Sequence, residues 1–227
     1  MYPEYMPDSL PRSGETRPID QLVARLEAQT GVDVLDLRPA LRAARQQART
    51  YHLTDSHWND WGAYVGYRAI HERLARRGIG LGGVAPAPAE REVHTTPGGG
   101  LAQLVGMRDV YTEENITMRL LAPRAEVSPE HRERYDERVR LLLPIAHGVP
   151  RSGLPRAVMF RDSFGNALVP YLAESFERIL YVWDRDIDLR IIAEEQPDVV
   201  IQEIVGRFLE RLPKTMEQLR KAPRKRR

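Results

Sequence analysis

The sequence predicts an α/β fold in which a mainly parallel sheet is covered by helices on both faces, giving three α/β/α layers. Three observations carry this prediction. The chain has 227 residues, 42% of them hydrophobic, which is enough to bury a full core in one domain. It has no cysteine, so disulfides and thiolate metal sites cannot replace that core. Its last third alternates apolar runs with helical patterns, as chains with parallel sheets do.

The expected elements follow from hydrophobic periodicity and from Gly and Pro punctuation. A Gly/Pro-rich connection is expected over 78–100, and an exposed charged stretch over 124–138. The predicted helices cover residues 18–30, 39–48, 60–77, 101–107, 167–174, 189–194 and 204–212. The predicted strands cover residues 32–37, 116–121, 139–145, 157–160, 179–183 and 199–201.

The charge is concentrated at the end of the chain. The formal net charge is +2, but six cations lie in residues 220–227, and the rest has 28 basic against 32 acidic residues, a net charge of −4. We therefore expect one domain over 1–213 and a basic, disordered tail over 214–227. No aromatic residues interleave the cations, so a specific nucleic-acid partner is not expected. The alternative is a weak contact of the tail with an anionic surface.

Several function classes find no support. The chain has no run of about 18 apolar residues, so no span of a membrane is predicted. The segment 1–5 has neither a basic n-region nor an apolar h-region, so no signal peptide is predicted within the chain. No glycine-rich phosphate-binding pattern is present, and we expect no cofactor.

Asp55 and His57 lie two residues apart, just before the predicted helix 60–77. In an extended segment such residues point the same way, so the carboxylate can reach the imidazole Nδ1–H and leave Nε2 free as a base. A local hydrogen-bonded pair without catalytic function is an alternative. A metal site with His52 is a weaker alternative, because no distant third ligand is evident.

Ser163 follows the predicted strand 157–160 directly and precedes a helix. Its hydroxyl is therefore expected at the carboxyl edge of the sheet, where open α/β folds place their ligands. Backbone N–H groups at the helix start could stabilise an oxyanion, the Ser163 N–H first among them. Together with Asp55 and His57 this gives a nucleophile, a base and an orienting carboxylate. The alternative is an ordinary turn or N-cap serine.

Two blocks carry a family resemblance. Residues 54–67, TDSHWNDWGAYVGY, resemble the TDTHWNxxGAxxAY signature of the alginate O-acetyltransferase family of the AlgX/AlgJ type, which has an SGNH-hydrolase-like domain. Residues 160–183, FRDSFGNALVPYLAESFERILYVW, are similar to that family's nucleophile block. Weaker similarities follow in the expected order, at YPEYMPDSLP, TGVDVLDLRPALRAAR, GGGLAQLVGM and PDVVIQEIVGRFLE.

The resemblance implies that Asp55, His57 and Ser163 form a catalytic triad on an SGNH-hydrolase-like fold with a circularly permuted order. It implies an acyltransferase that moves acetyl groups to hydroxyls of a secreted, alginate-like polysaccharide through an acetyl-serine. It also implies a periplasmic location and an acetyl donor delivered by a membrane acyltransferase partner. An acetyl esterase with the same triad and a non-catalytic polysaccharide-binding or assembly protein remain alternatives.

Three further residues are candidates for substrate binding: Arg161, Asn166 and Trp58. A guanidinium binds a uronate carboxylate bidentately, but Arg161 has an ion pair with Asp162 as an equal alternative. Trp58 and Trp61 are a possible sugar platform, although at least one of them is expected in the core.

Two departures from the family pattern stand out. The chain begins where family members have already run through an N-terminal strand, so the resemblance implies that this strand is missing here. Gly206 and Arg207 stand where the family pattern reads Glu-Arg.

Overall fold

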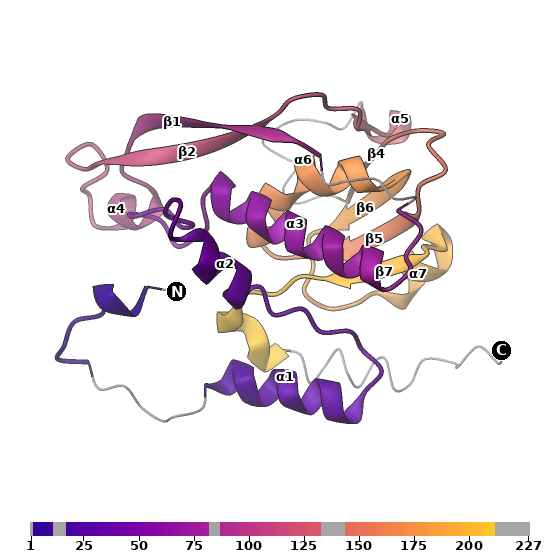
Figure 1. Cartoon of the computed structure of the whole chain (residues 1–227), viewed down its shortest axis with the longest axis horizontal. Coiled ribbons are helices and arrows are strands. Elements are labelled where there is room, and N and C mark those ends of the chain that lie inside the picture. The colour runs from indigo at the N-terminus through magenta and orange to yellow at the C-terminus, as the bar shows by residue number, and fades with distance from the viewer. Residues whose placement is uncertain (1, 11–16, 82–86, 133–143, 212–227) are drawn as a thin grey trace.

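A five-stranded sheet, with helices packed on both faces, forms the centre of the molecule (Figure 1). The computed structural model describes residues 2–10, 17–81, 87–132 and 144–211. The strands lie in the order β3-β4-β6-β5-β7. Their bounds are Glu126–Val127 (β3), Ile145–Gly148 (β4), Arg156–Phe160 (β5), Arg178–Val182 (β6) and Val199–Gln202 (β7).

The sheet is mixed, which corrects the prediction of a mainly parallel one. Strand β5 pairs in parallel with β6 and with β7, as the alternating pattern predicts. Strand β4 is antiparallel to β6, and β3 is antiparallel to β4. Parallel neighbours need a long crossover connection, and helical segments supply it between β5, β6 and β7. These three strands are the parallel ones among the described strands of the sheet.

Both faces of β5 and β6 are buried. On one face, Met159 and Tyr181 pack in a core with α3 (Asp60–Arg76) and α6 (Val169–Leu172). On the other face, Phe160 packs in a second core beside α7 (Leu189–Glu195). A strand that is buried on both faces has a continuous run of apolar residues, which is why the sequence pattern predicts β5 and β6 as strands.

Helix α3 has a defined start and an unusually close neighbour. The side chain of Asn59 caps the helix by accepting a hydrogen bond from Gly62 N at 3.0 Å. The same side chain donates to Arg49 O at 2.7 Å, which ties the helix start to the preceding segment. A Cβ at Gly62 would lie 2.1 Å from Thr50 O, so only glycine allows this approach.

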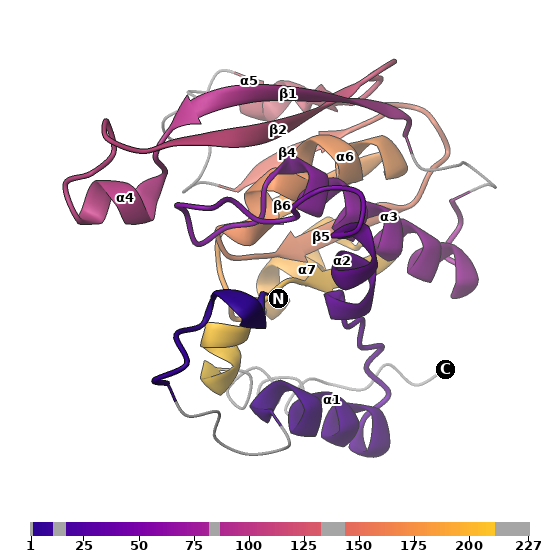
Figure 2. The ribbon, with the colours of Figure 1, turned by 60° about the vertical axis from the view of Figure 1, so that its left-hand side comes forward.

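An antiparallel hairpin of β1 (Ala89–Pro97) and β2 (Thr112–Leu120) lies beside α3 and α6 (Figure 2). The connection between its two strands contains α4 (Gly100–Leu104). The sequence analysis was wrong to treat residues 89–97 as irregular connection. Strand β1 is almost fully exposed, so it lacks the apolar alternation that marks a strand. Strand β2 buries Ile116 and Met118 against the core.

The other elements agree in part with the sequence. Helices α1 (Pro18–Gln29) and α2 (Arg38–Ala44) form as predicted, with α2 shorter. Residues 32–37 form no strand. The charged stretch contains β3 and α5 (Pro129–Arg132), and the described part of the predicted strand 139–145 joins β4 only at its end. The predicted helix 167–174 is split into a 3₁₀ helix at Phe164–Leu168, α6, and a 3₁₀ turn at Ala173–Ser175.

The predicted C-terminal helix 204–212 is a 3₁₀ helix over Gly206–Arg211, and the predicted basic tail 214–227 lies outside the described residues. Within the described ranges, no helix has the length and apolar composition needed to cross a membrane.

The contact at Gly62 gives a first prediction. Gly62→Ala should lower the free energy of unfolding by about 1–3 kcal/mol, because the new Cβ overlaps a backbone oxygen that cannot move alone. Urea unfolding measures the loss. Gly31→Ala is the control, because nothing lies within 4 Å of a Cβ there. Equal stability of the two variants would contradict the close approach of Gly62 to Thr50 O.

Candidate active site

Asp55 and His57 lie in a short loop whose ends are fixed to one another. Tyr51 and Trp58 form an antiparallel bridge, and His52 N donates to His57 O at 3.2 Å. The loop runs directly into helix α3. The two catalytic candidates therefore lie on a closed turn anchored at the start of a long helix.

The structure brings Asp55, His57 and Ser163 together. His57 Nδ1 lies 2.6 Å from Asp55 Oδ1, and His57 Nε2 lies 2.7 Å from Ser163 Oγ. Both distances are within hydrogen-bond range. An ionised Asp55 accepts from Nδ1–H, which leaves Nε2 to accept the Ser163 hydroxyl proton. This is the arrangement of a nucleophile, a base and an orienting carboxylate that the sequence predicts.

Asp55 is held ionised. Partial burial raises the pKa of its carboxyl, but hydrogen bonds from the His57 side chain, from Gly100 N–H and from His57 N–H together lower it to about 2. Gly100 N lies 2.8 Å from Asp55 Oδ2. A Cβ at Gly99 would lie 2.8 Å from Asp55 Cβ, so the glycine run 98–100 serves to bring backbone donors up to this carboxylate.

Ser163 stands on the turn between β5 and the 3₁₀ helix Phe164–Leu168. The side chain of Asp162 fixes this turn from both sides. Its Oδ1 accepts from Phe164 N and its Oδ2 from Val205 N, each at 2.9 Å. The nucleophile is therefore tied to the segment that follows β7 as well as to its own helix.

One backbone donor at the nucleophile is available. The Phe164 N–H is already used by Asp162, whereas within the described part of the chain no acceptor accompanies the Ser163 N–H. Asn166 follows three residues later in the 3₁₀ helix, where residues i and i+3 share a face. Its Oδ1 accepts from Arg161 Nη1, so its amide NH₂ is directed away from that guanidinium.

Trp58 is a core residue, which corrects the expectation that it binds substrate. Its side chain is buried at 5% exposure and packs on Phe164, with ring centroids 5.6 Å apart. Its Nε1–H donates to Phe164 O at 3.1 Å. A buried indole offers no face to a sugar, and it instead joins the histidine loop to the nucleophile turn. Trp61 is half-buried and packs at the edge of the same core.

Arg161 is also buried, at 2% exposure, so it does not present its guanidinium to a polymer. Its Nη1 donates to the Asn166 side chain and to Asp162 O, and the guanidinium lies 5.0 Å from the centre of the Trp183 ring. Of the two alternatives left open for Arg161, its burial and these contacts favour the structural one, in which it orients Asn166. The exposed guanidinium near the nucleophile belongs to Arg207, which lies over the Phe164 ring.

Glu113 on β2 is a site residue that the sequence analysis missed. Its buried carboxylate accepts from Leu53 N, and from Thr54 Oγ1 at 2.6 Å. Thr54 Oγ1 in turn accepts from Gly99 N at 2.7 Å. Burial raises the pKa of Glu113, but these hydrogen bonds lower it further, below its usual range. No local pattern reveals this partner, because it lies almost sixty residues from the loop that it holds.

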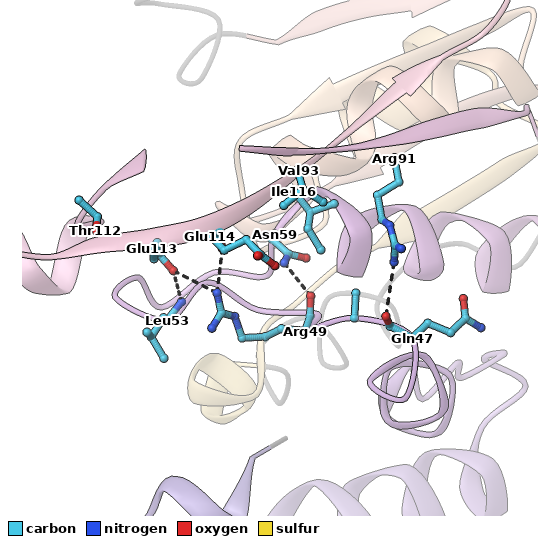
Figure 3. Close-up of a pocket in the computed structure, with 11 residues that line it drawn as sticks. Gln47, Arg49, Leu53, Asn59, Arg91, Val93, Thr112, Glu113, Glu114 and Ile116 are labelled. Carbon is cyan, nitrogen blue, oxygen red and sulfur yellow. Dashed lines mark hydrogen bonds and ion pairs between the residues drawn. The ribbon is translucent and has the colours of Figure 1, made fainter. Parts of the chain in front are cut away.

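An open cavity of about 480 Å³ lies between the hairpin and the segment before α3 (Figure 3). Arg49 and Arg91 extend into it from opposite sides, and Leu53 and Glu113 line its end nearest the triad loop. Arg49 Nη2 donates to Glu114 O at 2.8 Å. Among the described residues, no cluster of three or more His, Cys, Asp or Glu side chains is placed to hold a metal ion.

A Ser-His-Asp arrangement at the carboxyl edge of parallel strands, with helices on both faces, is typical of serine-hydrolase-like domains. A family model described as "SGNH hydrolase-like domain, acetyltransferase AlgX" matches residues 1–139. The chain therefore belongs to the AlgX/AlgJ family. The matched segment contains Asp55 and His57 and ends before Ser163.

Individual relatives agree with this placement. The chain is 31% identical to a probable alginate O-acetylase AlgJ of Pseudomonas syringae over 96 residues, which are 42% of this chain and 22% of that protein. The chain thus matches about a fifth of the length of this curated relative.

Solved structures share the fold at low identity. The O-acetyltransferase domain of Pseudomonas putida AlgJ superposes with a TM-score of 0.57 at 20% identity, covering 98% of this chain and 79% of that one. A DHHW family protein from Eubacterium siraeum gives 0.61 at 17% identity, covering 86% and 73%. Bacillus cereus PatB1 gives 0.58 at 18% identity, covering 81% and 72%.

Trp58→Phe tests the link between the two triad segments. Phenylalanine fills most of the space but removes the indole N–H that donates to Phe164 O, so we expect a loss of about 1–2 kcal/mol in unfolding free energy. Modification of Ser163 by a serine-directed sulfonyl fluoride should slow as well. Trp61→Phe is the matched control, because Trp61 donates only a 3.4 Å bond to Ala44 O. Unchanged Ser163 reactivity in Trp58→Phe would contradict the link.

Glu113→Gln tests the support of the triad loop. An amide NH₂ would face N–H and O–H donors, so we expect a loss of about 1–3 kcal/mol and at least a tenfold slower modification of Ser163. Glu114→Gln, the exposed neighbour, should change neither quantity. Chemical denaturation and intact-protein mass against time measure both. Equal behaviour of the two variants would show that Glu113 does not support the loop.

Proposed function

We propose that this chain is an O-acetyltransferase that carries the acetyl group on Ser163 and passes it to a hydroxyl of a polysaccharide. The observation that carries the proposal is the continuous hydrogen-bonded series from Asp55 through His57 to Ser163 Oγ. A turn serine without a catalytic function does not require a base at 2.7 Å that is itself oriented by an ionised carboxylate. The series therefore favours a catalytic chain over a non-catalytic polysaccharide-binding or assembly protein.

The first half-reaction forms the acetyl-serine. Ser163 Oγ attacks the carbonyl carbon of an acetyl ester while its proton passes to His57 Nε2. The tetrahedral intermediate then collapses, the bond to the donor oxygen breaks, and His57 returns the proton to that leaving oxygen. Asp55 stays ionised throughout and stabilises the imidazolium.

The oxyanion of that intermediate needs donors that are already in place. The Ser163 N–H is the first, and the Asn166 amide, fixed by Arg161, is the second. Loss of one such donor typically costs about 10²–10³ in rate. In this role Asn166 contacts the reacting group, and Arg161 orients Asn166 through their side-chain hydrogen bond.

The second half-reaction reverses the first with a different alcohol. A sugar hydroxyl gives its proton to His57 and attacks the acetyl carbonyl, and Ser163 leaves with that proton. The resemblance and the family support an alginate-like acceptor, an acetyl donor supplied by a membrane partner, and a periplasmic site of action. A uronate carboxylate would meet the exposed Arg207 rather than Arg161.

An acetyl esterase is the second candidate, and one observation favours it. The His57 side chain is 35% exposed, so water can approach the base that would activate it. The two functions share every step up to the acetyl-serine and differ only in the acceptor.

Intact-protein mass after incubation with p-nitrophenyl acetate tests the acetyl-serine. Wild type should gain one acetyl group and Ser163→Ala none, with ester turnover lower by at least about 10³-fold. Ser56→Ala is the matched control, because the side chain of this exposed serine of the same loop takes no part in the Asp55–His57–Ser163 series, so the variant should behave as wild type. An adduct that survives in Ser163→Ala would overturn the assignment.

The same preparation distinguishes the acceptors. Acetylated uronate oligosaccharide, seen by mass spectrometry after addition of the oligosaccharide to the acetyl-enzyme, would establish transfer. Release of free acetate alone, at an unchanged rate with and without oligosaccharide, would identify an esterase instead.

A further inference from the structure

Glu203, the first residue after β7, approaches the nucleophile turn from the neighbouring strand. Its backbone N–H donates to Phe160 O at 2.8 Å, which continues the pairing of β7 with β5. Its Oε2 accepts from Asp162 N at 3.2 Å, and Gly165 N–H donates to the same carboxyl group. A Cβ at Gly165 would lie 3.2 Å from this oxygen, so the turn closes tightly around it.

A second carboxyl group lies against the first. The Glu203 carboxyl group, which accepts from Asp162 N, also lies against the Asp162 side chain, and a hydrogen bond between the two carboxyl groups requires that one of them carry a proton. Asp162 already accepts from Phe164 N and Val205 N, both at 2.9 Å, so each of its two carboxyl oxygens faces a backbone donor. The proton therefore belongs on Glu203.

We propose that Glu203 and Asp162 form a carboxyl pair that shares one proton and holds the turn on which Ser163 stands. This inference rests on the proposed function, because it assigns both residues as positioning residues for that nucleophile. The protonated Glu203 donates to Asp162, and Asp162 fixes the Phe164 and Val205 amides. Neither carboxyl group touches the reacting atoms.

The surroundings of Glu203 support this protonation state. Burial and the negative charge of Asp162 raise the pKa of Glu203 to about 8. The charged or titratable groups around the turn include His57, which bonds to Ser163 Oγ, and Arg207, which lies over the Phe164 ring. They also include Arg161, whose aliphatic stem lies against Gly165, and Tyr51, whose own pKa is raised to about 12. The Arg161 guanidinium is directed to Asn166 and Trp183.

Loss of the shared proton has a defined consequence. Above about pH 8 the pair would carry two negative charges and lose the hydrogen bond that joins them. The turn would then relax and move Ser163 Oγ away from His57 Nε2. A misplacement of about 1 Å at a reacting atom can cost about 100-fold in rate.

Two substitutions separate the effect of the shared proton from the effect of the Glu203 side chain itself. Glu203→Gln keeps a donor of the same shape but cannot ionise, and Glu203→Leu removes both the donor and the acceptors. The probe is phenylmethylsulfonyl fluoride, which transfers its sulfonyl group to Ser163 Oγ as fluoride leaves and the hydroxyl proton passes through His57 to solvent. The readout is the rate constant for modification from pH 6 to 10, corrected for hydrolysis of the reagent.

Wild type should show a rate that falls near pH 8, where Glu203 loses its proton. Glu203→Gln should stay within about threefold of wild type at pH 7 and lose the alkaline fall, whereas Glu203→Leu should be at least tenfold slower. Glu194→Gln, an exposed glutamate of α7, should reproduce the wild-type profile. A purely structural role for Glu203 would change the rates but leave the shape of the pH profile unchanged.

The melting temperature supplies a readout that needs no reaction. Because the folded-state pKa of Glu203 lies above its ordinary value of 4.5, the native chain binds more protons than the unfolded chain between about pH 4.5 and 8. This group therefore makes wild type less stable as pH rises through that window. The difference in Tm between Glu203→Gln and wild type should grow with pH and level off above about pH 9.

The outcomes separate this proposal from the proposed function. An alkaline fall that persists in Glu203→Gln, or a constant Tm difference, would overturn the carboxyl pair. A normal sulfonylation profile without any acetyl adduct would overturn acetyl transfer and leave the pair standing. Absence of sulfonylation at Ser163 in folded wild type would overturn both. If Glu203→Leu fails to fold, the pH profile of Glu203→Gln still tests the carboxyl pair.

Discussion

The hydrogen bond from the Trp58 indole to Phe164 O is the contact on which the site depends. The histidine loop and the nucleophile turn are more than a hundred residues apart in sequence, and nothing covalent sets their separation. A buried indole has two rotatable bonds, packs on the Phe164 ring and ends in one directed donor. It therefore fixes both the distance and the orientation between the two segments. The Phe164 ring also packs against the His57 ring, with the ring centroids 4.8 Å apart.

The segment 54–59 acts as a unit because four of its polar side chains bond to different parts of the structure. Thr54 bonds to Glu113 of the hairpin, Asp55 to the glycine run, and His57 to the nucleophile. Asn59 caps α3 and holds the segment before the loop. The loop therefore needs no regular structure of its own, since hydrogen bonds from three neighbouring elements hold it.

The sequence predicted those features that leave a local pattern. Strands β5, β6 and β7 are continuous apolar runs, α3 has an Asn cap and a clear stripe, and the triad lies in two short motifs. Features made by long-range contact were missed or wrong. The exposed strand β1 has no alternation, and the antiparallel addition of β3 and β4 depends on a chain path that periodicity does not encode. The same limit explains why residues next to the nucleophile were favoured for substrate binding: neighbours of Ser163 in the chain face inward, while an exposed guanidinium comes from Arg207.

The site holds two acids in opposite protonation states, and the reason is visible in their partners. Asp55 receives three hydrogen bonds from donors, which outweigh its partial burial and lower its pKa to about 2. Glu203 faces Asp162 in a desolvated turn, so its pKa is about 8. Environments that push two carboxyl groups apart in this way usually mark a division of roles. When His57 takes the Ser163 proton, the new positive charge meets a carboxylate that is already ionised, and no second proton has to move. The turn under Ser163, in contrast, is stable because its pair carries one negative charge and not two. Attack requires the first condition and accurate placement requires the second, so an ionised acid and a neutral acid support the same nucleophile in different ways.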